Sequence, residues 1–216
     1  MPRKLFLFPF GGNAREALLS VLEINRISQE WEIAGFLDDN SLTHGQQCCG
    51  VMVVGGRELL DGFPEAMLLA VPGSPQNFRT RDKIIASLSI QPKRFATIVH
   101  PSTACSPDAK IGFNTVIMAN SVISCGVSVG NHCIILPNTV VSHDSTVADY
   151  CCLGSNISVS GSVGIGEKCY IGSGSRMREH ITIGAGTLVG LGSNVVSDIP
   201  SGVIAIGNPA KVTHVF

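Results

Sequence analysis

A histidine followed directly by an aspartate is the pair in this chain that is best suited to acid–base chemistry. His143 and Asp144 stand side by side in the segment VVSHDSTV. An imidazole titrates near neutral pH, and a carboxylate that orients the ring leaves its other nitrogen free to take a proton. The pair predicts a general base, His143, supported by Asp144. Two exposed side chains without a catalytic role are the alternative.

A second group of candidates lies in the first part of the chain. The sequence predicts strands over 3–8, 31–39 and 66–73, and helices over 14–27 and 79–88. Strand, glycine turn and helix in succession are how a nucleotide-binding α/β unit begins, and ligands of such sheets bind at the carboxyl ends of the strands. This edge should collect the predicted substrate-binding residues Gly11, Gly12, Asn13, Asp38, Asp39, Gly73 and Arg81.

Each of these residues also has a purely structural interpretation. A glycine pair before a helix N-terminus suits an anion, yet the full G-x-G-x-x-G pattern is absent and Pro9 stands where its first glycine is expected. A tight turn is therefore the alternative for Gly11 and Gly12. A solvated strand end is the alternative for the two aspartates, and surface charge is the alternative for Arg81.

Residues 111–200 repeat in blocks of six without interruption. The first residue of every block is Ile, Val, Leu or Met, the second is often Gly, and the fifth is mostly small or β-branched. A six-residue period is the signature of a parallel β-helix, in which three blocks form one triangular coil of 18 residues. Residues 18 apart should therefore stack, which places Gly161 next to His143 and leaves room there for a slender thioester arm. A structural glycine at a corner is the alternative for Gly161.

The cysteines and the other histidines fit the same register. Cys133, Cys151 and Cys169 are 18 apart at fifth positions, so we expect an interior ladder of free thiols. His132 and His180 are interpreted as exposed corner residues. Because no two of His132, His143 and His180 share a column, we predict that the chain has no metal site.

Composition and character along the chain set the broad class. The formal net charge is −1, with no basic stretch, and no apolar run approaches membrane-spanning length. Neither nucleic acid nor a membrane is expected as a partner, and the N-terminus shows no signal-peptide pattern, so a cytoplasmic protein is expected. The change of character near residue 97 predicts two domains, 1–96 and 97–216.

Several motifs together resemble a known family. These are KLFLFPFGGNARE, GFLDD, VHPSTACSPDAKIG, VVSHDSTVADY and the C-terminal AIGNPAKV. They resemble the bacterial nucleotide-sugar N-acetyltransferases, which have a small Rossmann-like domain ahead of a left-handed β-helix of hexapeptide repeats. The resemblance implies an α/β Rossmann-like nucleotide-sugar-binding domain followed by the acyltransferase β-helix, and a homotrimer with active sites between neighbouring chains.

The resemblance also implies roles for individual residues. His143 corresponds to the family's base, Asp144 to its supporting acid, and Lys211 in GNPAK to a position that meets the phosphates of coenzyme A. Cys152 stands where the family often has a second histidine touching the thioester, so Cys152, Gly161 and Lys211 are the predicted contacts of acetyl-CoA. Other departures from the family pattern are Pro9, Asn13 and Leu136.

The expected activity is acetyl-CoA-dependent N-acetylation of a UDP-, GDP- or dTDP-linked amino sugar in the synthesis of surface glycans such as lipopolysaccharide. Three alternatives stay open at the level of sequence. One is an acyltransferase with another donor or a hydroxyl acceptor. Another is a trimeric nucleotide-sugar-binding protein that has lost efficient catalysis, and the third is an unrelated β-helix metalloenzyme.

Overall fold

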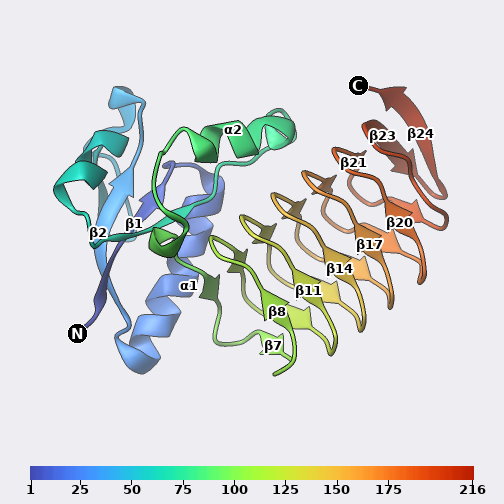
Figure 1. Ribbon diagram of the computed structural model, residues 1–216, viewed down its shortest axis with the longest axis horizontal. Helices are drawn as coiled ribbons and strands as arrows, with labels where there is room; N and C mark the ends of the chain where they lie inside the picture. Colours follow the sequence, from blue (N-terminus) through green and yellow to red (C-terminus); the bar gives the residue numbers. More distant parts are fainter.

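The computed structural model describes residues 1–216. Figure 1 shows an α/β unit formed by the first part of the chain, and beside it a row of stacked coils that runs to the C-terminus. The two parts differ in their repeat. The first alternates strands with helices, whereas the second consists of two-residue strands separated by corners and ends in two longer strands.

The α/β unit is built on one five-stranded sheet in the order β3-β4-β2-β1-β5, parallel except for β3. Its strands are β1 (Arg3–Phe8), β2 (Trp31–Leu37), β3 (Gln47–Cys48), β4 (Val51–Gly55) and β5 (Met67–Ala70), and its helices are α1 (Gly12–Ser28) and α2 (Arg81–Ala86). Short 3-10 turns cover Ser41–Thr43, Arg57–Gly62, Phe78–Thr80 and Pro92–Arg94.

The predicted strands and helices of this unit are all present. The strand β1 has the predicted bounds, α1 is longer than predicted, and β2, β5 and α2 are shorter. The hairpin β3–β4 was not predicted from the sequence. Its two turn residues, Cys49 and Gly50, both have positive φ angles of 49° and 79°, the geometry of a two-residue hairpin turn. Cys49 is an uncommon residue for that conformation, which explains why the sequence carries no clear hairpin signal there.

The second part is a triangular prism. Each of its three faces is a sheet of mainly parallel strands, an arrangement that fits a left-handed β-helix. The first face comprises β6 (Ile98–Val99), β9 (Val116–Ile117), β12 (Ile134–Ile135), β15 (Cys152–Leu153), β18 (Tyr170–Ile171), β21 (Leu188–Val189), β23 (Val203–Gly207) and the antiparallel β24 (Ala210–Val215). The second face comprises β7 (Ala104–Cys105), β10 (Val122–Ile123), β13 (Val140–Val141), β16 (Ser158–Val159), β19 (Arg176–Met177) and β22 (Asn194–Val195). The third face comprises β8 (Lys110–Ile111), β11 (Ser128–Val129), β14 (Thr146–Val147), β17 (Gly164–Ile165) and β20 (Thr182–Ile183).

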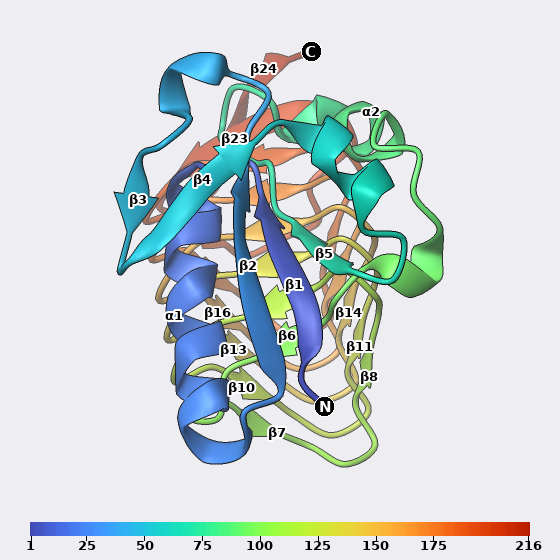
Figure 2. The same cartoon turned by 90° about the vertical axis from the view of Figure 1, so that its left-hand side faces the viewer.

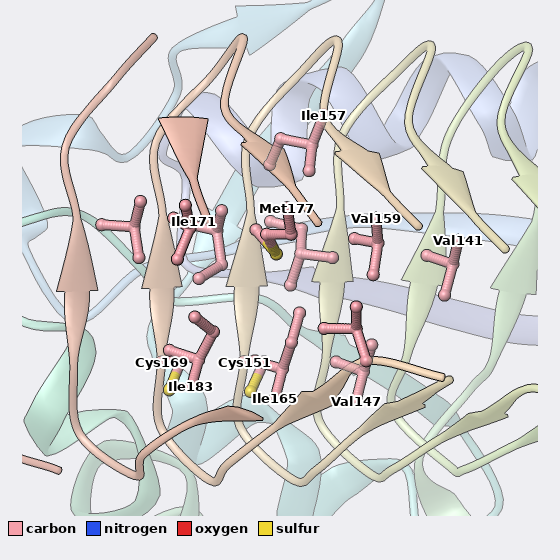
Figure 3. Close-up of a cluster of buried hydrophobic side chains, with 14 of the residues drawn as sticks. Val141, Val147, Cys151, Ile157, Val159, Ile165, Cys169, Ile171, Met177 and Ile183 are labelled. Carbon is pink, nitrogen blue, oxygen red and sulfur yellow. The ribbon is translucent and has the colours of Figure 1, made fainter. Parts of the chain in front are cut away.

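The repeated six residues have distinct places in each coil. First-position side chains fill the prism, as Val141, Val159 and Met177 do in Figure 3. Cys151 and Cys169 stack in the same interior and, with Cys133, form the predicted ladder of buried free thiols. Fourth-position residues turn each corner in the left-handed region, with φ of 59° at His132 and at Asp144. Within each face, neighbouring strands pair residues that are 18 positions apart, which confirms the predicted coil length.

The α/β unit docks on the first face of the prism. One core contains residues from both parts: Leu18 and Val21 of α1 pack in the same cluster as Ile134 and Cys152, which point outward from the first face. In Figure 2, α1 runs alongside the coils while the sheet lies in front of them. The first face is thereby buried along its first four strands, β6, β9, β12 and β15. The edge between the second and third faces lies on the opposite side of the prism.

Candidate active site

His143 and Asp144 stand at the edge between the second and third faces, in the corner that joins β13 to β14. Nδ1 of His143 lies 2.9 Å from Oδ2 of Asp144, and 59% and 68% of the two side chains are exposed. An ionised carboxylate can only accept a hydrogen bond, so Nδ1–H donates and Nε2 carries the free lone pair. This tautomer is the one that a general base requires.

Both side chains of the pair are seated on glycines of neighbouring coils. A Cβ atom at Gly161 would lie 2.5 Å from both Cε1 and Nε2 of His143, and a Cβ at Gly126 would lie 2.6 Å from Oδ1 of Asp144. Such separations are far below van der Waals contact. The ring and the carboxylate therefore occupy space that any other residue would fill, which makes the glycines part of the geometry of the pair. The column through Gly161 was predicted from the sequence, but the seat on Gly126 was missed, although 126 is also 18 residues from Asp144.

The glycine turn at the start of α1 forms the second candidate region. Gly11 is the N-cap of α1, no side chain caps this helix end, and its first turn contains no acidic residue. A Cβ at Gly11 or Gly12 would meet no atom within 4 Å. The first-turn N–H groups of a helix attract anions. Since packing does not require these glycines, the turn has room for a ligand to approach the backbone.

The two aspartates after β2 have different surroundings. Asp38 accepts the backbone N–H of Phe10 at 2.9 Å and that of Asn40 at 2.8 Å, so it holds the glycine turn against the end of β2. Asp39 is paired with Arg57, whose Nε lies 2.7 Å from Oδ2. The Arg57 guanidinium, through its hydrogen bonds and charge, lowers the pKa of Asp39. Both carboxylates are thus engaged within the chain, and Asp38 lies next to the turn.

Asn13 and Gly73 meet, as predicted, at the carboxyl edge of the sheet. Nδ2 of Asn13 donates to the carbonyl of Gly73 at 2.9 Å and to that of Val71 at 3.3 Å. This amide joins the first turn of α1 to the segment that follows β5. Its amide nitrogen is used inside the chain, and the contact with substrate stays a prediction.

Arg81 differs most from its predicted role. Its side chain is completely buried and donates to the carbonyls of Pro72, His132 and Tyr150. The guanidinium has no carboxylate partner and does not reach solvent. It fastens the α/β unit to the prism, so the predicted substrate contact is incompatible with its burial.

The three predicted contacts of acetyl-CoA lie in three different places. Gly161 is beneath His143, whereas Cys152 is buried on the first face, where burial raises the pKa of its thiol. Lys211 is exposed on β24. Cys152 does not stand beside His143, because the outward direction of β15 points under the α/β unit. The predicted contact of Cys152 with a thioester is incompatible with this position.

His132 is the main error in the sequence-based placement of side chains. It is 5% exposed and stacks on Tyr150 with ring centroids 4.7 Å apart, and its Nδ1 lies 2.8 Å from Nδ2 of Asn114. Burial, together with the nearby Arg81 charge, lowers its pKa to about 4. Asn114, His132 and Tyr150 are 18 apart, so the column was visible, but the α/β unit that covers it was not. His180, by contrast, is exposed as predicted.

No group of three or more His, Cys, Asp or Glu side chains is arranged to hold a metal ion. None of the helices has the length and apolar character needed to cross a bilayer. The site residues form two regions. One is the His143 pair at the far edge of the prism, and the other is the glycine turn with Asp38 above the first face.

Comparison with known proteins places this geometry in context. Residues 94–200 match the family model of the GMPPB C-terminal domain. No curated protein sequence matches the chain. The acetyltransferase domain of PglB from Neisseria gonorrhoeae is 29% identical with a TM-score of 0.84, covering 98% of this chain and 100% of that one.

A second solved structure is a perosamine N-acetyltransferase from Caulobacter crescentus. It is 28% identical with a TM-score of 0.85, and the match covers 99% of this chain and 97% of that one. Both neighbours are acetyltransferases. The PglB domain has also been solved with acetyl coenzyme A, and the Caulobacter enzyme, as a histidine-to-asparagine variant, with CoA and GDP-perosamine. The similarity extends over both parts of this chain, which agrees with the predicted reaction class.

Proposed function

We propose that this chain transfers the acetyl group of acetyl-CoA to the amine of a nucleotide-linked amino sugar. The main support is the His143 ring, which is oriented by Asp144 and packs on Gly161. This ring belongs to a chain that matches acetyltransferases over nearly its full length. CoA and a nucleotide amino sugar are bound by the Caulobacter neighbour, and the same two classes of ligand are proposed here.

The chemistry follows from the free Nε2 of His143. A sugar amine attacks a thioester only as the neutral amine, and the nitrogen becomes cationic as its bond to the carbonyl carbon forms. Nε2 takes the surplus proton, the C–S bond breaks, and the protonated imidazole returns that proton to the departing CoA sulfur. The products are an N-acetyl sugar and CoA. A backbone N–H at the corner would stabilise the oxyanion of the intermediate.

The α/β unit, residues 1–96, is proposed to be a Rossmann-like domain that binds the nucleotide, and residues 97–216 the acyltransferase domain. The parallel order β4-β2-β1-β5 and the helix that follows β1 support this assignment. Diphosphate oxygens would approach the open backbone at Gly11 and meet the N–H group of Gly12, next to Asp38; the N–H of Gly11 itself donates to the carbonyl of Pro9. Exposed Lys211 would meet the phosphates of CoA.

The active unit is proposed to be a homotrimer. Within one chain the glycine turn lies over the first face, whereas His143 stands on the opposite edge of the prism. Sugar and base must meet, so a neighbouring chain would supply the His143 edge. A hollow of about 650 Å³ lies between α1 and the prism and is lined by Glu16, Met118 and Pro137 among others. The His143 edge of the neighbouring chain would pack against this hollow. A cytoplasmic location and a role in surface glycan synthesis complete the proposal.

The proposal is tested by incubating the purified protein with acetyl-CoA and a panel of UDP-, GDP- and dTDP-linked amino sugars. Products are followed by mass spectrometry, because the protein's own thiols would disturb a thiol assay. One acetylated sugar that disappears with His143→Asn is the expected result. Absence of product with every sugar, from a protein that remains folded, would overturn the proposal.

A further inference from the structure

We infer that Gly73 is a positioning residue. Because it has no side chain, the segment after β5 can pack directly against Cys152 of the prism. This contact fixes the position of the glycine turn at Gly11 and Gly12. The inference rests on the proposed function, because it assigns the turn to the nucleotide sugar. This role requires no contact between Gly73 and that ligand. It acts through Asn13.

Three segments converge on Gly73. A Cβ built there would lie 2.9 Å from Sγ of Cys152, 3.2 Å from Nε of Arg81 and 3.3 Å from Nδ2 of Asn13. Its φ is outside the left-handed region, so the backbone conformation itself would accept another residue. Only the lack of space selects glycine. Cys152 belongs to the prism and is buried in the core shared with α1, and therefore it cannot move aside freely.

Arg81 holds this contact from the other side. It donates to the carbonyl of Pro72, the neighbour of Gly73, and to the carbonyls of His132 at 2.8 Å and Tyr150 at 2.6 Å. Those last two residues are 18 apart and belong to successive coils. A buried guanidinium has a large desolvation penalty unless its donors are satisfied. The segment after β5 is consequently fixed at one position along the axis of the prism.

Asn13 connects this fixed segment to the candidate ligand site. Its Nδ2 donates to the carbonyl of Gly73 at 2.9 Å, and Asn13 lies in the first turn of α1, directly after Gly11 and Gly12. A displacement of Gly73 therefore moves the turn relative to the prism. Because a misplacement of about 1 Å between reacting groups can reduce a rate by roughly 10²-fold, the position of the turn matters for acetyl transfer.

Gly73→Ala is the test variant. We expect kcat/KM for the nucleotide amino sugar to fall roughly 10- to 100-fold, while KM for acetyl-CoA stays at the wild-type value. A general loss of folded protein would lower the apparent kcat and leave both KM values unchanged, so a raised KM for the nucleotide amino sugar identifies the positioning effect. Gly62→Ala is the matched control, because a Cβ there meets no atom within 4 Å; this variant should behave as the wild type.

A second substitution tests whether the contact with Cys152 is the cause. Cys152→Ala removes the Sγ atom against which the new Cβ would press. The double variant Gly73→Ala/Cys152→Ala should regain most of the lost kcat/KM, measured against Cys152→Ala alone. A double variant that remains roughly 10- to 100-fold below Cys152→Ala would overturn the inference. This comparison does not require Gly73→Ala to be stable enough to assay by itself.

Hydrogen exchange of the backbone amides of residues 10–13 provides a measurement without turnover. These amides should exchange faster in Gly73→Ala and return toward the wild-type rate in the double variant. Unchanged exchange together with unchanged kinetics would overturn the inference. If the exchange pattern appears but the wild type acetylates no sugar, the seat on Cys152 is supported and the proposed function fails, so the two failures are distinguishable.

Discussion

The imidazole of His143 lies across Gly161, so close that a single added carbon at position 161 would come within 2.5 Å of Cε1 and Nε2. The two residues are 18 positions apart and belong to consecutive coils. The orientation of the candidate base is therefore set by an absent side chain as well as by the hydrogen bond to Asp144. Gly126 serves the carboxylate of Asp144 in the same way.

Gly161→Ala should reduce kcat without unfolding the prism. The added methyl group forces the imidazole ring away from its position, so the lone pair of Nε2 no longer points toward the amine of the substrate. We expect a fall of roughly 10²-fold, the size associated with misplacing a catalytic group by about 1 Å. Gly164→Ala is the control, since its Cβ would have no neighbour closer than 3.8 Å. Equal kcat for the two variants would show that the seat is unimportant.

His143→Asn should lower kcat by roughly 10²- to 10⁴-fold, the usual contribution of a general base. Asp144→Asn should have a smaller effect, because an asparagine oxygen can still accept the Nδ1–H bond, and asparagine tolerates the left-handed corner at φ 59°. Steady-state kinetics of the two variants, with thermal unfolding to verify the fold, measure this order. The reverse order would remove His143 from the role of base.

The prism was predictable from the sequence because its repeat is local. Every six residues solve the same packing problem, so the phase of Ile, Val, Leu and Met fixes which side chains enter the core. The column through His143 and Gly161 followed from arithmetic alone. The stacking of Cys133, Cys151 and Cys169 followed in the same way, and the structure confirms that all three are buried.

The seam between the two parts was not predictable, because its contacts join residues distant in sequence. Arg81 reaches carbonyls 51 and 69 positions away, and no local pattern distinguishes such an arginine from a surface charge. Cys152 and His132 were misplaced for the same reason. The repeat shows that they point outward, but it does not show that the α/β unit covers that face.

His132 should make the protein less stable as the pH falls from about 6.5 toward 4. Its pKa is lowered to about 4 in the folded chain from an ordinary value of 6.5. Between these values the unfolded chain binds the proton and the folded chain does not, so the free energy of unfolding decreases by up to about 3 kcal/mol. Urea unfolding at several pH values measures the slope.

Two matched variants isolate this contribution. His132 and His180 both occupy left-handed corners, with φ of 59° and 57°, a conformation that asparagine accepts. His132→Asn should flatten the dependence between pH 6.5 and 4, whereas His180→Asn, at an exposed corner, should leave it unchanged. A slope that survives His132→Asn would assign the effect to other groups.

The cysteines should separate into two classes by reactivity toward iodoacetamide. Cys49, Cys105 and Cys125 are exposed, and Cys48 is half-buried. The remaining four, Cys133, Cys151, Cys152 and Cys169, are buried. Burial raises the pKa of the Cys151 thiol well above its usual range, and only the thiolate reacts. Peptide mass spectrometry should find the exposed thiols labelled in the native protein and all eight after denaturation. Labelling of Cys151 as fast as Cys125 under native conditions would mean that the prism opens locally, because its side chain has no other route to solvent.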